Sequence, residues 1–319
     1  MTALKTFLPR AVLTGLLATL SATFSDTALA AIPIEHWTQP SGARVYLVQS
    51  PSIPMLDVQI DFDGGSRREP ARQAGLASAT AGLLSGGVAA QGSQPALDEN
   101  ALSEAWVDLG AQFGASAGSD RFTLQLRTLT QPDLLERAVA LAARQLAQPA
   151  FPDSVWARER ARSLAALREA ETRPGTHAGR AYAAAVYQGH PYGAQTTAQT
   201  LQAIGVNDMA GFYRQHVMAC GARISMVGAI DRATADRIAD RLLAAIAPNG
   251  CRSLAPVPEV APLAAAKDER IPFAAAQAQV LLGQPGVKRD DPDFLTLVVG
   301  NHILGASGFT SRLMDEARE

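Results

Sequence analysis

A serine flanked by glycines provides the most familiar catalytic pattern in the chain. Residues 114–118 read Gly-Ala-Ser-Ala-Gly, which matches the Gly-x-Ser-x-Gly pattern that places a nucleophilic serine on a turn between a strand and a helix. Here a segment of alternating apolar and polar residues, 122–129, follows closely, so the surrounding pattern predicts a β-hairpin. Small residues in such a hairpin favour close strand packing, and we do not expect serine-hydrolase chemistry.

Zinc chemistry would need imidazole ligands, because two histidines four residues apart on a helix can bind one zinc ion together. The chain has five histidines. His177, His216 and His302 have no ligand-type partner at that spacing, and His36 lies in the N-terminal arm. A metal site assembled from distant histidines is therefore kept only as an alternative.

A glycine-rich turn followed by a short apolar helix is the most informative stretch of the chain. Residues 64–70 read Gly-Gly-Ser-Arg-Arg-Glu-Pro, and residues 75–84 read Gly-Leu-Ala-Ser-Ala-Thr-Ala-Gly-Leu-Leu. This stretch resembles the start of the zinc-binding helix of the inverzincins, the insulinase, pitrilysin and mitochondrial-processing-peptidase family. In that family a Gly-Ser-Arg turn closes a strand, and the helix opens with Gly-Leu-Ala and continues His-x-x-Glu-His.

The resemblance places other residues where that family has its chemistry. Ser78 and Gly82 match the two histidine ligands, and Ala81 matches the glutamate that serves as general base. A serine hydroxyl is a poor zinc ligand, glycine has no side chain, and alanine cannot accept a proton. We therefore predict no bound zinc, no other cofactor and no peptide hydrolysis by this chain alone. An active peptidase with an unconventional metal site is the less favoured alternative.

The family's remaining zinc ligand is a glutamate on a long helix downstream, and Glu159 lies at the matching position. It is interpreted either as a relic ligand or as a helix carboxylate paired with the neighbouring Arg158 and Arg160. The resemblance also covers the His-Pro-Tyr loop that begins at His190, which in the family serves structure more often than metal binding.

The N-terminus has the pattern of a secretory signal. Lys5 and Arg10 supply positive charge, residues 11–20 are apolar, and residues 28–30 read Ala-Leu-Ala, a small-x-small cleavage site. We expect export to a bacterial periplasm, a mature chain beginning at Ala31, and no stable membrane span after cleavage, with an uncleaved anchor as the alternative. A formal net charge of −2 without a basic stripe argues against nucleic-acid binding.

Cys220 and Cys251 are the two cysteines of the chain, and both lie in the predicted mature part. An exported compartment permits a disulfide between them. Sequence alone does not report their separation in space, so the bridge is left open at this stage.

Alternating segments predict strands at residues 43–48, 56–62, 122–129 and 223–228. Helical periodicity predicts helices at residues 71–84, 98–109, 132–148, 153–171, 178–187, 207–216 and 232–245. Strands that alternate with pairs of helices indicate the α+β class, with a sheet covered by one layer of helices, as in one half of a processing peptidase.

After a proline-rich linker the pattern restarts. Residues 278–283 resemble the strand that precedes Gly64, and residues 294–304 resemble the first helix. We therefore predict a signal peptide at 1–30, a first peptidase-like domain at 31–250, a linker at 251–268 and an incomplete second α+β domain at 269–319. The second half is shorter than the first, and we expect a C-terminally truncated chain.

The resemblance implies a role within this family that does not need catalysis. Paired members can divide the work between a chain that carries zinc and a partner that completes the substrate chamber. We therefore expect a non-catalytic subunit that pairs with a zinc-bearing relative and helps to bind peptides. The alternative from another class is a stand-alone peptide-binding or assembly protein without a hydrolytic role.

Overall fold

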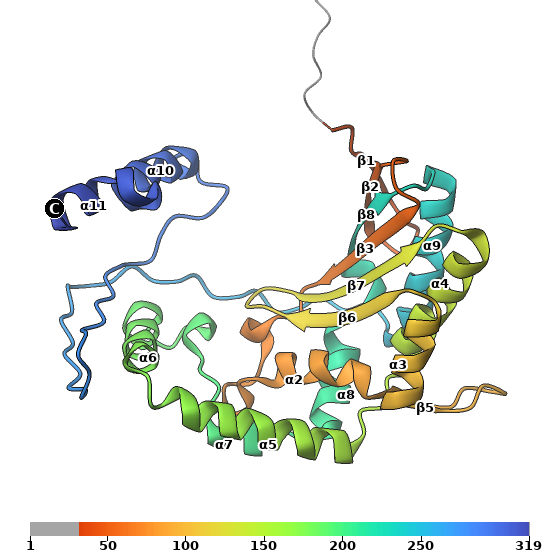
Figure 1. Cartoon of the computed structure of the whole chain (residues 1–319), viewed down its shortest axis with the longest axis horizontal. Helices are drawn as coiled ribbons and strands as arrows, with labels where there is room; N and C mark the ends of the chain where they lie inside the picture. Colours follow the sequence, from red (N-terminus) through yellow and green to blue (C-terminus); the bar gives the residue numbers. More distant parts are fainter. Residues whose placement is uncertain (1–31, 319) are drawn as a thin grey trace, which may run out of the picture.

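The computed structural model describes residues 32–318, so the signal predicted for residues 1–30 lies outside the described residues. A six-stranded sheet in the order β1-β2-β8-β3-β7-β6 forms the centre of the fold (Figure 1). The parallel pair is β2 with β8, and the other neighbouring strands run antiparallel. The strands are β1 Glu35–Thr38, β2 Arg44–Gln49, β3 Met55–Phe62, β6 Gln112–Ala117, β7 Phe122–Leu129 and β8 Arg223–Gly228.

One face of the sheet is apolar and carries the helices. Along β8, Ile224 and Met226 are buried whereas Arg223 and Ser225 are exposed, which is the period-two pattern of a half-covered strand. Helices α2 Leu76–Leu83, α3 Glu99–Asp108, α4 Pro132–Ala147 and α9 Arg232–Ile246 contact strands of this sheet. The chain also forms helices α5 Asp153–Ala170, α6 Pro174–Tyr187, α7 Ala198–Gln202 and α8 Val206–His216. A small second sheet joins β4 Gly87–Val88 to β5 Leu97–Asp98. The predicted α+β class, with a layer of helices on a sheet, is confirmed.

The single helix predicted for residues 71–84 is wrong in one respect. The segment is divided into a 3-10 turn, Ala71–Gln73, and helix α2. Gly75 separates the two with a φ of 103°, in the left-handed region that breaks a right-handed helix and favours glycine. Helix α2 therefore begins after this residue, and its position is set by what binds its first turn.

The strand predicted for residues 278–283 is also wrong. Residues 250–292 contain turns and bends but no helix or strand. A strand needs a neighbour for its backbone hydrogen bonds, and no strand of the described chain pairs with this segment. Helix α10 Phe294–Asn301, a π-helical turn His302–Ala306 and helix α11 Arg312–Arg318 follow. The described part of the predicted second domain is thus helical and irregular, without a sheet.

Cys220 and Cys251 are joined by a disulfide in the structure. Cys220 belongs to the 3-10 turn Ala219–Gly221 before β8, and Cys251 follows the turn after α9. The bond therefore encloses one strand and one helix and ties the start of the irregular segment to the sheet. No helix within residues 32–318 is both long and apolar enough to span a bilayer.

Replacing both cysteines by serine should lower the free energy of unfolding by about 3–4 kcal/mol, because the closed loop restricts the unfolded chain. The sequence separation of 31 residues sets this loop. Urea unfolding of the wild-type protein and of the Cys220→Ser/Cys251→Ser variant in non-reducing buffer measures the difference. Thiol labelling of the denatured wild-type protein is the control, and two labelled thiols per chain would refute the bond.

Candidate functional site

The start of helix α2 is fixed by a half-buried carboxylate, that of Glu69. Glu69 accepts hydrogen bonds from the backbone N–H of Gly75 at 2.8 Å and of Ala77 at 2.6 Å. Burial raises the pKa of Glu69, and these two hydrogen bonds lower it in part. A carboxylate here satisfies N–H groups that have no partner within the helix and lies at the positive end of the helix dipole. Glu69 therefore positions α2 from its first turn.

The far end of α2 is held by a buried polar network. Gln145 of α4 donates to the carbonyl oxygen of Leu84 at 2.8 Å, and it accepts from the indole N–H of Trp106 at 2.9 Å. Gln145 is 2 % exposed, so these bonds satisfy groups that would otherwise lie unpaired in the core. Helix α2 is thus fixed at both ends, and this fixes the position of its outer face relative to the neighbouring helices.

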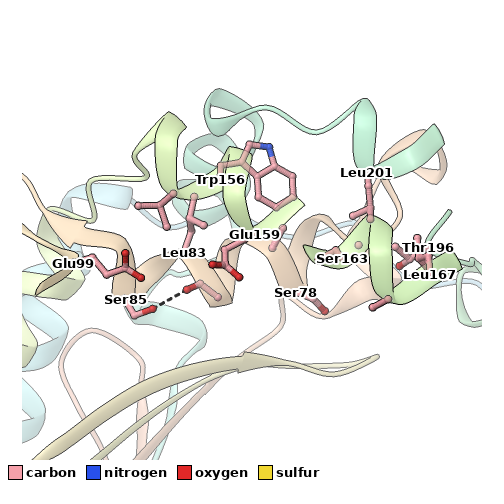
Figure 2. A pocket seen from close by; sticks show the side chains of 15 residues that line it. Ser78, Leu83, Ser85, Glu99, Trp156, Glu159, Ser163, Leu167, Thr196 and Leu201 are labelled. Carbon is pink, nitrogen blue, oxygen red and sulfur yellow. Dashed lines mark hydrogen bonds between the residues drawn. The ribbon is translucent and has the colours of Figure 1, made fainter. Parts of the chain in front are cut away.

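A pocket of about 600 Å³ lies between α2 and α5. Ser78 and Gly82, four residues apart on α2, are exposed and line it together with Glu159 of α5 (Figure 2). The structure therefore brings together three of the four positions singled out from the sequence. Ala81 is different, because it is 4 % exposed, packs in the core and does not line the pocket.

Arginines neutralise the carboxylates of this pocket. Glu159 accepts from Arg158 Nε at 3.1 Å and from Arg162 Nη1 at 2.8 Å. Arg158 also donates to both carboxylate oxygens of Glu99, a residue of α3 that lines the same pocket. The interpretation of Glu159 as an arginine-paired carboxylate agrees with these contacts, although Arg162 rather than Arg160 is the second partner.

The donors in this pocket do not fit a zinc ion. The pocket supplies two arginine-paired carboxylates and the hydroxyls of serine and threonine, whereas protein-bound zinc takes imidazole, thiolate and carboxylate ligands in a tetrahedral set. Within residues 32–318 no group of three histidine, cysteine or acidic side chains is arranged to hold a metal. What the pocket retains is a concave surface of mixed polarity with no net negative charge from its two glutamates.

The Gly-Ser-Arg turn packs closely against the hairpin between β6 and β7. A Cβ on Gly65 would lie 2.3 Å from the carbonyl oxygen of Ser119, so this position requires glycine. Arg67 then links three segments, because it binds Asp63 at 3.1 Å and Asp120 at 2.9 Å, and Tyr192 donates to the same Asp120 oxygen at 2.6 Å. The turn after β3, the hairpin and the His-Pro-Tyr loop are thereby held together.

His190 has a structural environment. Its Nδ1 accepts from the backbone N–H of Tyr192 at 3.1 Å, so Nε2 carries the proton and donates to the carbonyl oxygen of Pro258 at 2.9 Å. Both ring nitrogens therefore form hydrogen bonds, and the ring joins the irregular segment to the His-Pro-Tyr loop. Ser116 lies within strand β6 opposite Thr123, which agrees with the hairpin predicted from the sequence and not with a nucleophile on a strand-to-helix turn.

Several residues that define the site were missed by the sequence analysis. Glu69 lies seven positions before Leu76, outside the cap and first-turn positions that mark a helix start, so no local signal reveals its role at α2. Gln145 and Glu99 carry no such signal, because their roles depend on contacts with residues more than fifty positions away or on a neighbouring helix.

Two family models cover most of the chain. Residues 44–200 match the model described as insulinase (peptidase family M16), and residues 203–319 match the model described as the peptidase M16 inactive domain. With the α+β fold described above, these matches show that the chain belongs to the peptidase M16 (insulinase) family. The second match begins before β8, which is a central strand of the six-stranded sheet. The six-stranded sheet therefore contains strands from both matched regions.

Solved structures agree with this assignment. A crystal structure described as the peptidase M16 inactive domain from Pseudomonas fluorescens superposes with a TM-score of 0.77 at 29% identity, covering 90% of this chain and 68% of the other. Pitrilysin superposes with a TM-score of 0.55 at 20% identity and covers 67% of this chain. The first half of the periplasmic protease PqqL from Escherichia coli superposes with a TM-score of 0.60 at 15% identity and covers 72% of this chain. This chain covers 23% and 49% of those two chains. No match was found among curated proteins.

The stability of the turn around Asp63 should depend on pH. Burial raises the pKa of Asp63, but hydrogen bonds from Arg68 and Arg67 outweigh it and lower the pKa overall. A carboxylate with a lowered pKa stabilises the fold above its ordinary pKa of about 4, and this contribution is lost as the pH falls through the lowered value. The difference in unfolding free energy between the wild-type protein and Asp63→Asn should therefore be largest near pH 7 and shrink below about pH 4.

Urea unfolding at a series of pH values measures this difference. Asp57→Asn is the matched control, because Asp57 forms an exposed ion pair with Arg127 on the open sheet face, and such pairs contribute at most about 1 kcal/mol. A difference for Asp63→Asn that stays constant from pH 7 to pH 3 would contradict the assignment.

Proposed function

We propose that this chain is a non-catalytic subunit of an exported zinc-peptidase complex and that it helps to form the chamber that binds peptides. The observation that carries the proposal is the pocket between α2 and α5. Ser78 and Gly82 line this pocket, and the resemblance of residues 75–84 to the family's motif assigns them to the zinc-ligand positions and Ala81 to the position of the general base. A chain that keeps the walls and lacks the reactive groups is suited to holding a peptide.

An open strand edge beside the pocket supports peptide binding. Strand β6 is at the edge of the sheet and contacts α2, whose outer face lines the pocket. Its sequence, Gln-Phe-Gly-Ala-Ser-Ala, contains none of the prolines or charges that usually protect an edge. The opposite edge strand, β1, has only four residues and follows Pro33. An extended peptide could therefore add to β6 by backbone hydrogen bonds while its side chains reach the pocket.

The geometry of β6 identifies the backbone groups that face the open edge. Gly118 donates to the carbonyl oxygen of Arg121, so these two residues form a hydrogen-bonded pair of the antiparallel ladder. Because such pairs alternate along a strand, Ser116 also directs its backbone groups toward β7, whereas Ala115 and Ala117 direct theirs outward. These two alanines are the expected contacts of a bound peptide.

The proposed partner is an exported relative that carries the intact His-x-x-Glu-His motif. The export part of the proposal rests on the pattern of residues 1–30, and pairing is common in this family. Large apolar side chains near the end of the chain also remain exposed, among them Leu282, Leu295 and Val299, and surfaces of this kind mark association sites. The stand-alone peptide-binding reading is the second candidate, because the pocket and the open edge both lie within this one chain.

Addition of this chain should raise the peptidase activity of the zinc-bearing relative, with Ala115→Pro reducing the gain. Proline removes the outward N–H of Ala115 and leaves the ladder to β7 intact. The loss of one peptide hydrogen bond should raise KM by about three- to tenfold. Ala115→Ser keeps the N–H and is the matched control.

The assay compares the catalytic chain alone with the same chain plus the wild-type protein or either variant. Equal activity in all four samples would eliminate the subunit proposal. Peptide binding by this chain alone, measured on the same variants, would then decide whether the stand-alone reading holds.

A further inference from the structure

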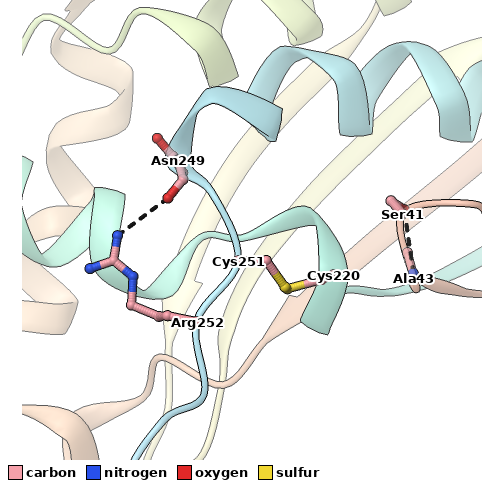
Figure 3. The surroundings of a disulfide bond; sticks show 6 residues. All are labelled: Ser41, Ala43, Cys220, Asn249, Cys251 and Arg252. Carbon is pink, nitrogen blue, oxygen red and sulfur yellow. Dashed lines mark hydrogen bonds between the residues drawn. A yellow bond between two sulfur atoms is a disulfide. The ribbon is translucent and has the colours of Figure 1, made fainter.

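A second pocket, of about 280 Å³, lies where the end of β3, the end of α8 and the irregular segment meet. It is separate from the pocket between α2 and α5, with which it shares no lining residue. Cys220 of the disulfide forms part of its wall, and the bonded Cys251 brings the next residue, Arg252, to the same pocket (Figure 3). The other polar side chains that line it are Asp63, Arg68 and His216.

His216 offers this pocket a hydrogen-bond acceptor. Its ring lies 3.2 Å through Nδ1 from the carbonyl oxygen of Asp63, and because a carbonyl only accepts, Nδ1 carries the proton and Nε2 has the free lone pair. Burial lowers the pKa of His216 and outweighs the hydrogen bond with Asp63, which raises it, and the charges of Arg68 and Arg252 lower it further, so the ring is neutral at pH 7.

Nε2 of His216 has no protein partner among residues 32–318, although the residue is only 4 % exposed. In the described chain, the side-chain nitrogens and oxygens that are both fully enclosed and without a partner are Nε of Arg67 and Nε of Arg144. Nε2 of His216 is therefore not fully enclosed. Because Nε2 is neither bonded nor enclosed, it opens to the pocket that His216 lines.

The two arginines of the pocket differ in what they can still bind. Arg68 donates to Asp63 through Nε and Nη2 and to the carbonyl oxygen of Ala255 through Nη1, so each of its nitrogens already donates and its charge is paired with the Asp63 carboxylate. Arg252 is exposed and makes one hydrogen bond of 3.3 Å, to the carbonyl oxygen of Asn249 (Figure 3). Within residues 32–318 Arg252 has no carboxylate partner, and its positive charge is available to a ligand.

We propose that this pocket binds a small oxyanion that still carries a proton, of the hydrogen phosphate class. The P–OH group would donate to Nε2 of His216, and the charged oxygens would accept from the guanidinium of Arg252. An oxyanion without a proton, such as sulfate, would instead direct an oxygen lone pair at the lone pair of Nε2. The pocket should therefore prefer hydrogen phosphate to sulfate, a tetrahedral anion of similar size, because only hydrogen phosphate carries a proton. This inference is independent of the proposed role in a peptidase complex.

Isothermal titration calorimetry of the wild-type protein with inorganic phosphate and with sulfate, near neutral pH and at constant ionic strength, tests the proposal. Phosphate should bind at least about tenfold more tightly than sulfate, the difference expected from one gained hydrogen bond and one avoided repulsion. Arg252→Met should weaken phosphate binding by about tenfold, because a charge-assisted hydrogen bond is lost. Arg237→Met is the matched control and should bind phosphate as the wild-type protein does, because Arg237 is an exposed arginine of α9 whose hydrogen bond within residues 32–318 goes to Thr234.

His216→Phe keeps a ring in the core but removes the acceptor, and it should abolish the preference for phosphate over sulfate. Its fold is checked by circular dichroism, and Arg252→Met, which changes an exposed side chain, provides the test if His216→Phe does not fold. Equal affinity of the wild-type protein for the two anions, no measurable binding of phosphate, or an unchanged affinity in Arg252→Met would each overturn the proposal.

Discussion

The two hydrogen bonds from the first turn of α2 to the carboxylate of Glu69 are the contacts on which the rest of the site depends. They place the helix start directly after the left-handed Gly75, while Gln145 holds the last turn. With both ends fixed, the exposed face of α2 forms one wall of the pocket, and its buried face packs on the sheet. The same helix contacts the open edge strand β6. The pocket and the open edge of β6 are therefore both positioned by α2.

The electrostatics of this arrangement follow from charged residues on two helices, α3 and α5. Glu159 and Glu99 project into one pocket, and like charges so placed would repel each other and favour a bound cation. Arg158 lies between them and binds both. The charge of the two carboxylates in this pocket is thus balanced by arginine side chains of the protein. Ser78 and Gly82 leave the space beside Glu159 open, and a Cβ added at Gly82 would meet no atom within 4 Å.

Local patterns predicted most of the fold. The alternation of residues 122–129 and 223–228 gave β7 and β8 with the bounds observed, because a half-buried strand must alternate. The helix predicted across Gly75 failed because apolar periodicity does not report a left-handed φ. The strand predicted at residues 278–283 failed because a strand depends on a partner that a local pattern does not supply. Within the site, the pairing of Glu159 was predictable from its arginine neighbours. Glu99, Gln145 and the pocket around His216 were not, since distant segments create them.

Zinc binding measured in two variants tests the central claim, that α2 and α5 retain the geometry of a zinc site without its ligands. The wild-type protein should bind no zinc tightly. Ser78→His/Gly82→His places two imidazoles four residues apart on the exposed face of α2, opposite Glu159, and should bind one zinc ion per chain. Adding Glu159→Gln to that variant should weaken the binding. Stoichiometric zinc in the wild-type protein, or a double-histidine variant that binds zinc no better than the wild-type protein, would contradict the account.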